Sequence, residues 1–150
     1  MKKSTKFIIA LLVTVGALAI TYRVVNQAPS KDIAAGAQMQ EIITSGGCLQ
    51  CHSGSPDLPF YANWPVASGM VQKDVTQGYR AFDMTEMAAA LKAGKPVGKV
   101  ALAKVEKVIM DGTMPKHAYY MVHWGSSVTD AKKEMAMAWV KPVSYTHLRA

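Results

Sequence analysis

Residues 45–56 read SGGCLQCHSGSP and contain both cysteines of this 150-residue chain. Cys48 and Cys51 are separated by two residues, and His52 follows directly, which gives the pattern C-x-x-C-H. A disulfide between the two cysteines would close a very short loop and would stabilise the fold little, because the entropic contribution grows with loop length. The spacing and the adjacent histidine therefore point to a different use of the two thiols.

C-x-x-C-H is the pattern of covalent haem attachment. The two thiols can add across the two vinyl groups of the porphyrin, and the histidine that follows is carried under the ring, where its imidazole can ligate iron. The sequence therefore predicts one covalently attached haem c, bound through Cys48 and Cys51 with His52 as an iron ligand. Gly46 and Gly47 would let the backbone lie close to the macrocycle.

Three other interpretations of the motif compete with haem attachment. A thioredoxin-like redox pair would need a surrounding βαβ pattern, which the sequence does not show. A zinc site would need further ligands at finger-like spacing, and only the scattered His117 and His123 are available. A chance match to five residues is the third. Export of the chain, the use of both cysteines in the motif and a suitable distal ligand together favour haem.

Met114 is the predicted second axial ligand. It lies in the segment DGTMP, residues 111–115, where Gly112 would end a helix and Pro115 would stiffen the loop. A thioether opposite histidine favours ferrous iron and raises the reduction potential. His123 is the alternative ligand and would give a bis-histidine haem of lower potential, and Met114 could instead be an ordinary core residue.

The N-terminal residues 1–25 predict a signal peptide or a membrane anchor. Three lysines, at positions 2, 3 and 6, precede an apolar run over residues 7–22. As a helix the run would reach about 24 Å, against a hydrocarbon thickness of about 30 Å, so residues up to 25 are needed for a span. An A-x-A pattern at residues 17–19 could equally be a cleavage site. In both cases the remainder is expected in the periplasm, and an uncleaved helix over residues 7–25 would anchor it to the inner membrane.

The predicted domain organisation follows from these ends. Residues 26–35 form a polar linker, and residues 36–141 form a c-type haem-binding domain. Residues 142–150, PVSYTHLRA, resemble a translated library adapter, and we treat them as a non-native tail. Pro142 is expected to end the preceding helix, and the natural chain could continue beyond Lys141.

Charge gives no support to a nucleic-acid partner. The formal net charge is +7, but residues 26–141 carry twelve basic and ten acidic side chains, a net charge of +2. The sequence shows no arginine cluster, no interleaving of aromatic and basic residues and no helix-turn-helix signature. We therefore expect no nucleic-acid binding.

Apolar periodicity predicts an all-α fold. The expected helices cover residues 34–44, 66–77, 85–91 and 99–110, with a last helix after Thr129. Residues 83–86 resemble a capping box. No convincing alternation of period two appears, so the expectation is a small monohaem cytochrome c-like domain behind an N-terminal hydrophobic helix. In the loop at 53–65, Phe60, Tyr61 and Trp64 are expected around the haem edge.

The longer motifs resemble the Bacteroidetes-type haem-binding domain of the cytochrome c family. They are CLQCHSGSPDLPFYANWPVASG (48–69), YRAFDM (79–84), DGTMPKHAYYMVHWGSSVTDAKKEM (111–135) and AWVK (138–141). The resemblance covers about residues 40–141. It places Cys48, Cys51 and His52 on the family's haem motif and Met114 on its Met-Pro. In that family the domain occurs alone or as the N-terminal extension of di-haem cytochrome c peroxidases, and this chain is more similar to the fused form. It has no second C-x-x-C-H.

The predicted function is electron transfer by a periplasmic haem domain. The expected partners are a redox partner protein or a quinol-side donor, the membrane through the N-terminal helix, and a downstream di-haem peroxidase domain in the full-length protein. The chain itself is not expected to be catalytic, whereas the full-length protein could be a cytochrome c peroxidase. The alternatives are a five-coordinate haem enzyme, a gas or peroxide sensor, a free-standing electron carrier, or a haem-free exported helical domain.

Overall fold

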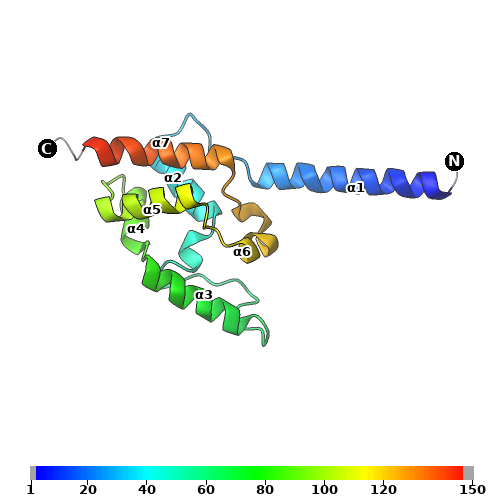
Figure 1. The fold of residues 1–150 in the computed structure, drawn as a ribbon, viewed down its shortest axis with the longest axis horizontal. Helices are drawn as coiled ribbons and strands as arrows, with labels where there is room; N and C mark the ends of the chain where they lie inside the picture. Colours follow the sequence, from blue (N-terminus) through cyan, green and yellow to red (C-terminus); the bar gives the residue numbers. More distant parts are fainter. Residues whose placement is uncertain (1–2, 147–150) are drawn as a thin grey trace.

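The computed structural model describes residues 3–146, and the side chains of residues 3–141. Within these residues the chain forms seven α-helices and two short 3-10 helices, and the described part contains no strand (Figure 1). The all-α fold class behind an N-terminal apolar helix is therefore confirmed. The elements in chain order are α1 (Lys3–Val25), α2 (Ala35–Ser45), η1 (Cys48–Gln50), α3 (Ser68–Ala81), α4 (Thr85–Lys92), α5 (Lys99–Asp111), α6 (His117–Val122), η2 (Trp124–Ser126) and α7 (Asp130–Thr146).

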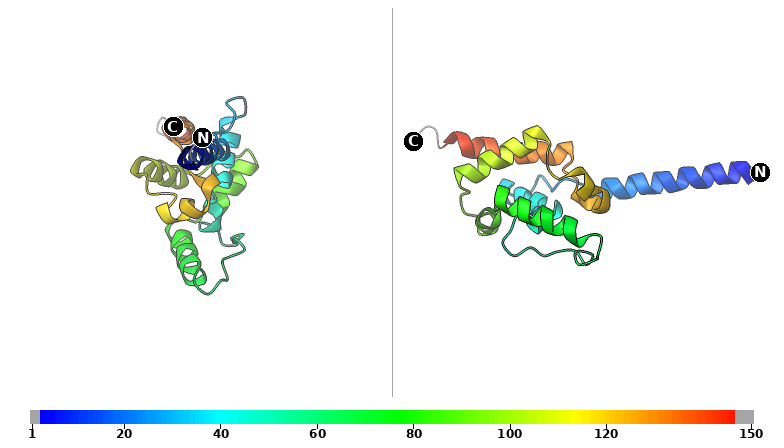
Figure 2. Two further views of the ribbon diagram at one scale, coloured as in Figure 1. Left: turned by 90° about the vertical axis from the view of Figure 1, so that its right-hand side faces the viewer. Right: turned by 60° about the horizontal axis from the view of Figure 1, so that its bottom comes forward.

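Helix α1 projects away from the rest of the chain: its C-terminal end meets the domain, and its N-terminal end extends away from it (Figures 1 and 2). It is 23 residues long and none of its residues is buried. It is the one described helix that is long and apolar enough to cross a membrane, although a signal sequence would meet the same criteria.

The hydrophobic core lies between α2, α4, α5 and α7. Each of these helices contributes apolar residues at helical spacing, so one face of each is removed from water. Buried members include Met39, Ile42 and Ile43 on α2, Leu102 on α5 and Val140 on α7. Helix α3 lies apart from this core at the lower side of the domain, as Figure 1 shows. The haem motif lies between the core and α3. Cys48 and Leu49 pack against the core, and Gly78 of α3 lies against Cys51.

Two local expectations are wrong. Helix α7 continues through Pro142 to Thr146, so the proline removes one donor from the helix without ending it. At the start of α4 the N-cap residue Met84 makes no side-chain cap hydrogen bond. Instead, the Asp83 carboxylate accepts a hydrogen bond from the backbone N–H of Thr85 at 2.9 Å, which replaces the predicted capping box.

Candidate haem site

An apolar cavity of about 460 Å³, partly open to solvent, lies between α2, α3 and α5. Four predicted site residues line it together: Cys48, Cys51, His52 and Met114. Its volume falls within the range of roughly 300–1,000 Å³ that is typical of small-molecule and cofactor sites. The fold thus brings together residues that are more than 60 positions apart in the sequence.

The His52 ring is oriented by a backbone carbonyl. Its Nδ1 lies 2.8 Å from the carbonyl oxygen of Phe82, which can only accept, so Nδ1 carries the proton and donates it. In the neutral ring the other nitrogen, Nε2, then has the lone pair that a metal ligand needs. A second contact holds the backbone of the motif, because the N–H of Met84 donates to the carbonyl oxygen of His52 at 2.7 Å.

The two cysteines lie in and just after the single turn of η1, and both thiols are free. Burial raises the pKa of the Cys48 thiol to about 11. Burial also raises the pKa of Cys51, and the nearby negative charge of Asp74 adds to this shift. Both thiols are therefore protonated at neutral pH, and neither is poised for a thiolate reaction of the thioredoxin type.

Two glycines make the site possible for different reasons. Gly47 has φ of 65°, in the left-handed region, and a Cβ there would also collide with the hydroxyl of Tyr119. Gly78, on α3, is buried against the motif: a Cβ there would lie 2.5 Å from the carbonyl oxygen of Cys51. Sequence reasoning missed Gly78, although a glycine inside a helical pattern is a signal of close packing.

Tyr119 is a second residue that sequence reasoning missed. It lines the cavity, and its hydroxyl donates a hydrogen bond to the Oε1 of Gln50 at 2.6 Å. Gln50 is one of the two residues between the cysteines, so this bond ties α6 to the motif. Burial raises the pKa of the Tyr119 hydroxyl to about 12.

Of the two candidates for the second axial ligand, Met114 lines the cavity and His123 does not. Near Met114, Lys116 forms an ion pair with Asp74 on α3 at 2.6 Å, which holds the loop after α5 in place. The Nε2 of His123 is 2.9 Å from the hydroxyl of Tyr61 and its Nδ1 is 3.1 Å from the carbonyl oxygen of Tyr119, so both ring nitrogens already have partners.

Two further methionines line the cavity, Met39 and Met84. Both are buried members of the hydrophobic core, with 4% and 6% of their surface exposed. Met114 is outside that core cluster and is 37% exposed, on a loop. Among the cavity-lining methionines, Met114 is thus the one that the core does not use.

The aromatic loop does not surround the cavity, contrary to expectation. Phe60, Tyr61 and Trp64 are absent from the cavity lining and contact one another edge to face, with ring centroids 5.5–6.4 Å apart. Phe60 is 83% exposed. The reason is that the loop leads from the motif to the far end of α3, where its rings pack on each other and, through Tyr61, on His123.

Basic side chains gather at the cavity. Lys104, Lys107, Lys116 and Lys133 contribute to its lining, alongside the acids Asp74 and Asp111. Each of these lysines already has a partner in the protein: Lys107, Lys116 and Lys133 form ion pairs with Asp111, Asp74 and Asp130, and Lys104 donates to the Ala81 carbonyl oxygen. Among the described residues no group of three or more His, Cys, Asp or Glu side chains is placed to hold a metal ion.

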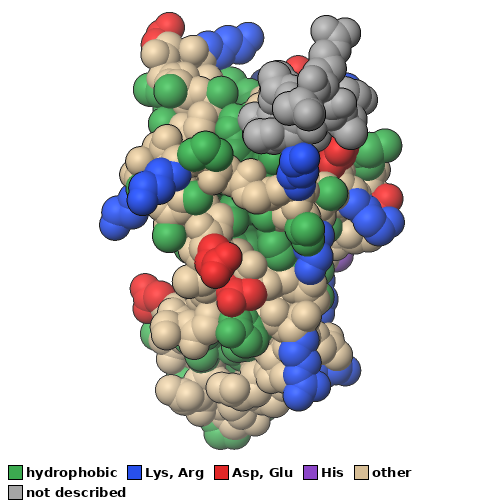
Figure 3. Space-filling view, turned by 90° about the vertical axis from the view of Figure 1, so that its left-hand side faces the viewer, with side chains coloured by type: hydrophobic (Ala, Val, Ile, Leu, Met, Phe, Trp, Pro, Cys, Tyr) green, Lys and Arg blue, Asp and Glu red, His purple; other side chains and the backbone are tan. Residues whose placement is uncertain are grey.

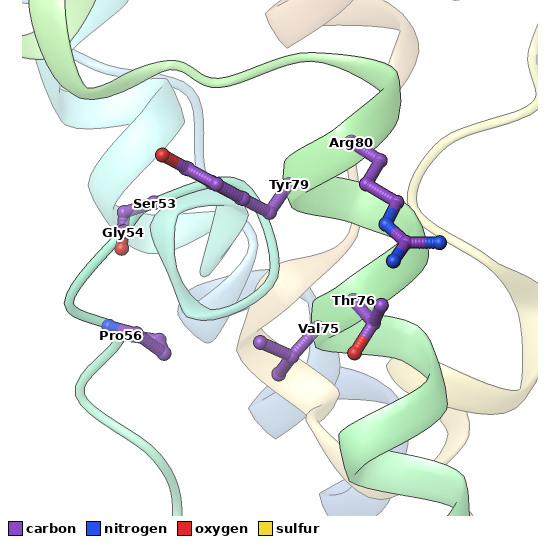
Figure 4. Close-up of a pocket in the computed structure, with 7 residues that line it drawn as sticks. All are labelled: Ser53, Gly54, Pro56, Val75, Thr76, Tyr79 and Arg80. Carbon is purple, nitrogen blue, oxygen red and sulfur yellow. The ribbon is translucent and has the colours of Figure 1, made fainter.

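A second, smaller pocket of about 260 Å³ lies between the loop after the motif and α3 (Figure 4). Its lining includes Ser53, Gly54 and Tyr79. Arg80 extends from the opposite side of α3, away from Ser53 and Gly54, as Figure 4 shows. The pocket contains no cysteine, histidine or carboxylate, and we assign it no role.

Residues 7–142 match the family model of the haem-binding domain. The chain belongs to the haem-binding domain family. A curated relative, the cytochrome c peroxidase Ccp of Escherichia coli strain K12, is 37% identical over 94 residues, which are 63% of this chain and 20% of the relative. The chain therefore spans about a fifth of the length of that relative. No solved structure matches the chain. The family match and the peroxidase relative thus support haem binding by this domain.

Proposed function

We propose that this chain carries one covalently attached haem c and transfers electrons in the periplasm. In this proposal Cys48 and Cys51 form the two thioether bonds, and His52 and Met114 are the axial ligands. Helix α1 remains attached and anchors the domain in the inner membrane, with the N-terminal lysines on the cytoplasmic side.

One observation carries the proposal. The two free thiols, the His52 ring with its Nε2 available and the Met114 thioether all line a single apolar cavity. Thioether attachment needs two thiols at one ring edge, and a six-coordinate haem needs two ligands on opposite faces. The cavity supplies this donor set without drawing on the methionines of the hydrophobic core.

The roles of the protein groups follow from their contacts. The Phe82 carbonyl holds the proton on His52 Nδ1 and so keeps Nε2 available as a ligand. The ion pair between Lys116 and Asp74 holds the loop that carries Met114 against α3. The apolar lining would favour the less charged reduced state of a bound haem. A bound haem would supply a one-electron redox couple.

The relative supports a role beside a peroxidase. That relative is a cytochrome c peroxidase, and this chain covers a fifth of its length. We propose that the domain accepts electrons from a quinol-side donor or a redox partner protein and passes them to a di-haem peroxidase domain. With both axial positions filled, the domain itself would have no open iron site for peroxide and would not be catalytic.

Two measurements on the full chain, expressed with a haem-attachment system, test this proposal. Mass spectrometry should give one added haem, and Cys48→Ala with Cys51→Ala should abolish covalent attachment. The ferric wild type should show the long-wavelength band of methionine-ligated haem. Met114→Ala should lose that band, and the ferrous variant should bind carbon monoxide.

Met110 offers a matched control for Met114. It lies on α5, is 72% exposed and does not line the cavity, so Met110→Ala should leave the spectrum unchanged. Loss of the native spectrum in His123→Ala, with none in Met114→Ala, would assign the ligand to His123 instead. Rapid carbon monoxide binding by the wild type would support a five-coordinate enzyme or sensor. Two unmodified thiols in material matured in this way would overturn the proposal as a whole.

A further inference from the structure

The C-terminal end of α1 is fastened to the domain by side-chain hydrogen bonds. The Asn26 side chain is buried, donates to the carbonyl oxygen of Trp124 at 2.6 Å and accepts from the backbone N–H of Ser127 at 3.0 Å. The Tyr22 hydroxyl donates to the Ser127 hydroxyl oxygen at 2.9 Å. Because Asn26 follows the last residue of α1, Val25, the domain is held at the very end of the helix.

This attachment fixes where the membrane surface would lie. A helix of 23 residues is about 34 Å long, slightly more than the roughly 30 Å hydrocarbon layer. If α1 crosses the membrane, its C-terminal turn lies at the boundary between lipid tails and headgroups. Trp124, which receives the Asn26 hydrogen bond through its carbonyl, lies at the same level.

Exposed apolar side chains gather at this end of the domain. We call them the aromatic face: Phe60, Trp64, Val66, Met121, Val122 and Trp124, which are 83%, 57%, 88%, 62%, 68% and 46% exposed. They belong to the loop before α3, to α6 and to η2. These segments lie at the end of the domain from which α1 departs (Figures 1 and 2).

Hydrogen bonds join these segments into one surface. The Tyr61 hydroxyl contacts His123 Nε2 at 2.9 Å, which links the aromatic loop to the residue between α6 and η2. The His123 ring stacks on Tyr119, with centroids 4.0 Å apart, and the Tyr119 hydroxyl reaches Gln50 of the haem motif. The aromatic face is therefore connected to the haem site by contacts between side chains.

The composition of the face fits a lipid boundary. Tryptophan and tyrosine are enriched at membrane–water interfaces, where an apolar ring and a polar atom can both be accommodated. Residues 115–127 contain no acidic side chain and residues 53–67 contain one, Asp57, so repulsion from anionic lipid headgroups is small. On the opposite end of the domain, Figure 3 shows Lys, Arg, Asp and Glu side chains scattered among hydrophobic and other ones.

We propose that the aromatic face inserts into the headgroup layer of the membrane that α1 crosses, and thereby holds the haem domain in one orientation on the bilayer. The proposal rests on the membrane anchoring in the proposed function, but it does not depend on the identity of the haem ligands. The occupant is lipid, and the face should be covered without any other protein.

The test uses the full haem-loaded chain in nanodiscs of phosphatidylethanolamine and phosphatidylglycerol. Some of the lipid carries a photoreactive diazirine near the headgroup, and mass spectrometry locates the crosslinked residues. Peptides that contain Trp64 and Met121 should be labelled several-fold more than the peptide that contains Val100. Val100 is a matched control because it is 72% exposed and apolar but lies on α5, outside the face.

Variants separate insertion from simple proximity. Phe60→Ser combined with Trp64→Ser should reduce labelling of the loop several-fold, whereas Val100→Ser should not change it. All three positions are exposed, so the haem spectrum should be that of the wild type, which shows that the variants fold. Equal labelling of the aromatic face and Val100 would overturn the inference. So would a face that is protected in native membranes but remains unlabelled in these nanodiscs, which contain no partner of the chain, because its occupant would then be a protein.

The labelling of α1 distinguishes failure of the docking inference from failure of the membrane anchoring in the proposed function. If α1 is labelled and the face is not, anchoring holds and the docking inference fails. If α1 itself is unlabelled, the membrane anchor fails and the docking inference fails with it. The visible spectrum reports haem ligation in every case.

Discussion

Replacing Gly78 by alanine tests whether α3 packs directly on the haem motif. A Cβ at this position would lie 2.5 Å from the carbonyl oxygen of Cys51 and 3.0 Å from both its carbonyl carbon and its Cβ. These are mainly backbone atoms, so rotation of a flexible side chain cannot relieve the overlap. Helix α3 or the motif must shift instead.

The expected loss of stability is the difference between two effects. Overpacking of a close contact costs roughly 1–3 kcal/mol, and alanine regains up to about 1 kcal/mol of helix propensity over glycine. With about 2 kcal/mol for overpacking, the middle of its range, less about 1 kcal/mol for helix propensity, Gly78→Ala should lower the free energy of unfolding by about 1 kcal/mol. With a urea dependence of about 2 kcal/mol per molar, the unfolding midpoint should fall by about 0.5 M. Far-UV circular dichroism of the full chain in detergent measures it.

Gly69 provides the control within the same helix. Nothing lies within 4 Å of a Cβ built there, so Gly69→Ala should leave the free energy of unfolding unchanged or raise it slightly. If Gly78→Ala proves as stable as Gly69→Ala, then α3 does not rest on Cys51. The placement of Phe82, whose carbonyl orients His52 from the residue after α3, would then also be in doubt.

Two other predictions concern buried polar groups. Tyr119→Phe should lower the free energy of unfolding by about 1 kcal/mol through loss of the hydrogen bond to Gln50. Combined with Gly47→Ala, it should cost less than the two single changes added together, because removing the Tyr119 hydroxyl relieves part of its clash with the new Cβ. Additive costs in the same urea assay would contradict this contact. Lys132 is 1% exposed, its ammonium donates to the Ser127 carbonyl oxygen, and burial lowers its pKa. Lys132→Met should stabilise the protein at pH 7 by about 1 kcal/mol, since a buried cation is costly. The gain should shrink as the pH rises toward 10.5, because the folded wild type loses this proton before the unfolded chain does. A destabilised variant across this pH range would show that the lysine is needed for folding.

The haem motif could be predicted from local sequence because its chemistry is local. Cys48, Cys51 and His52 lie within five residues, and the vinyl groups of one ring dictate their spacing. The helices α2, α4 and α5 were predictable for a related reason, since each places an apolar stripe on the shared core. The Gly and Pro neighbours of Met114 singled it out as a ligand; it lines the cavity, and its ligation of iron stays a prediction.

The supports of the motif could not be predicted, because they depend on long-range packing. The partner of His52 is a main-chain carbonyl 30 residues away, and that of Gln50 is a tyrosine 69 residues away. Neither contact has a periodic signal. The six-residue helix α6 is too short for such a signal as well. The position of Phe60 was predicted wrongly, since aromatic character alone does not distinguish a residue that lines a cofactor site from one that faces outward.

The two ends of the described chain leave the domain in opposite directions, as Figure 1 shows: α1 departs from one end, and the last turn of α7 reaches the other. Helix α7 has 17 residues and spans about 25 Å. A catalytic unit joined beyond α7 would therefore stand clear of the lipid and meet its water-soluble substrate freely, while fat-soluble reductants could reach the near side by lateral diffusion. The domain would then separate the lipid bilayer from the catalytic unit. Its length would set the distance over which electrons pass from the membrane side to that unit.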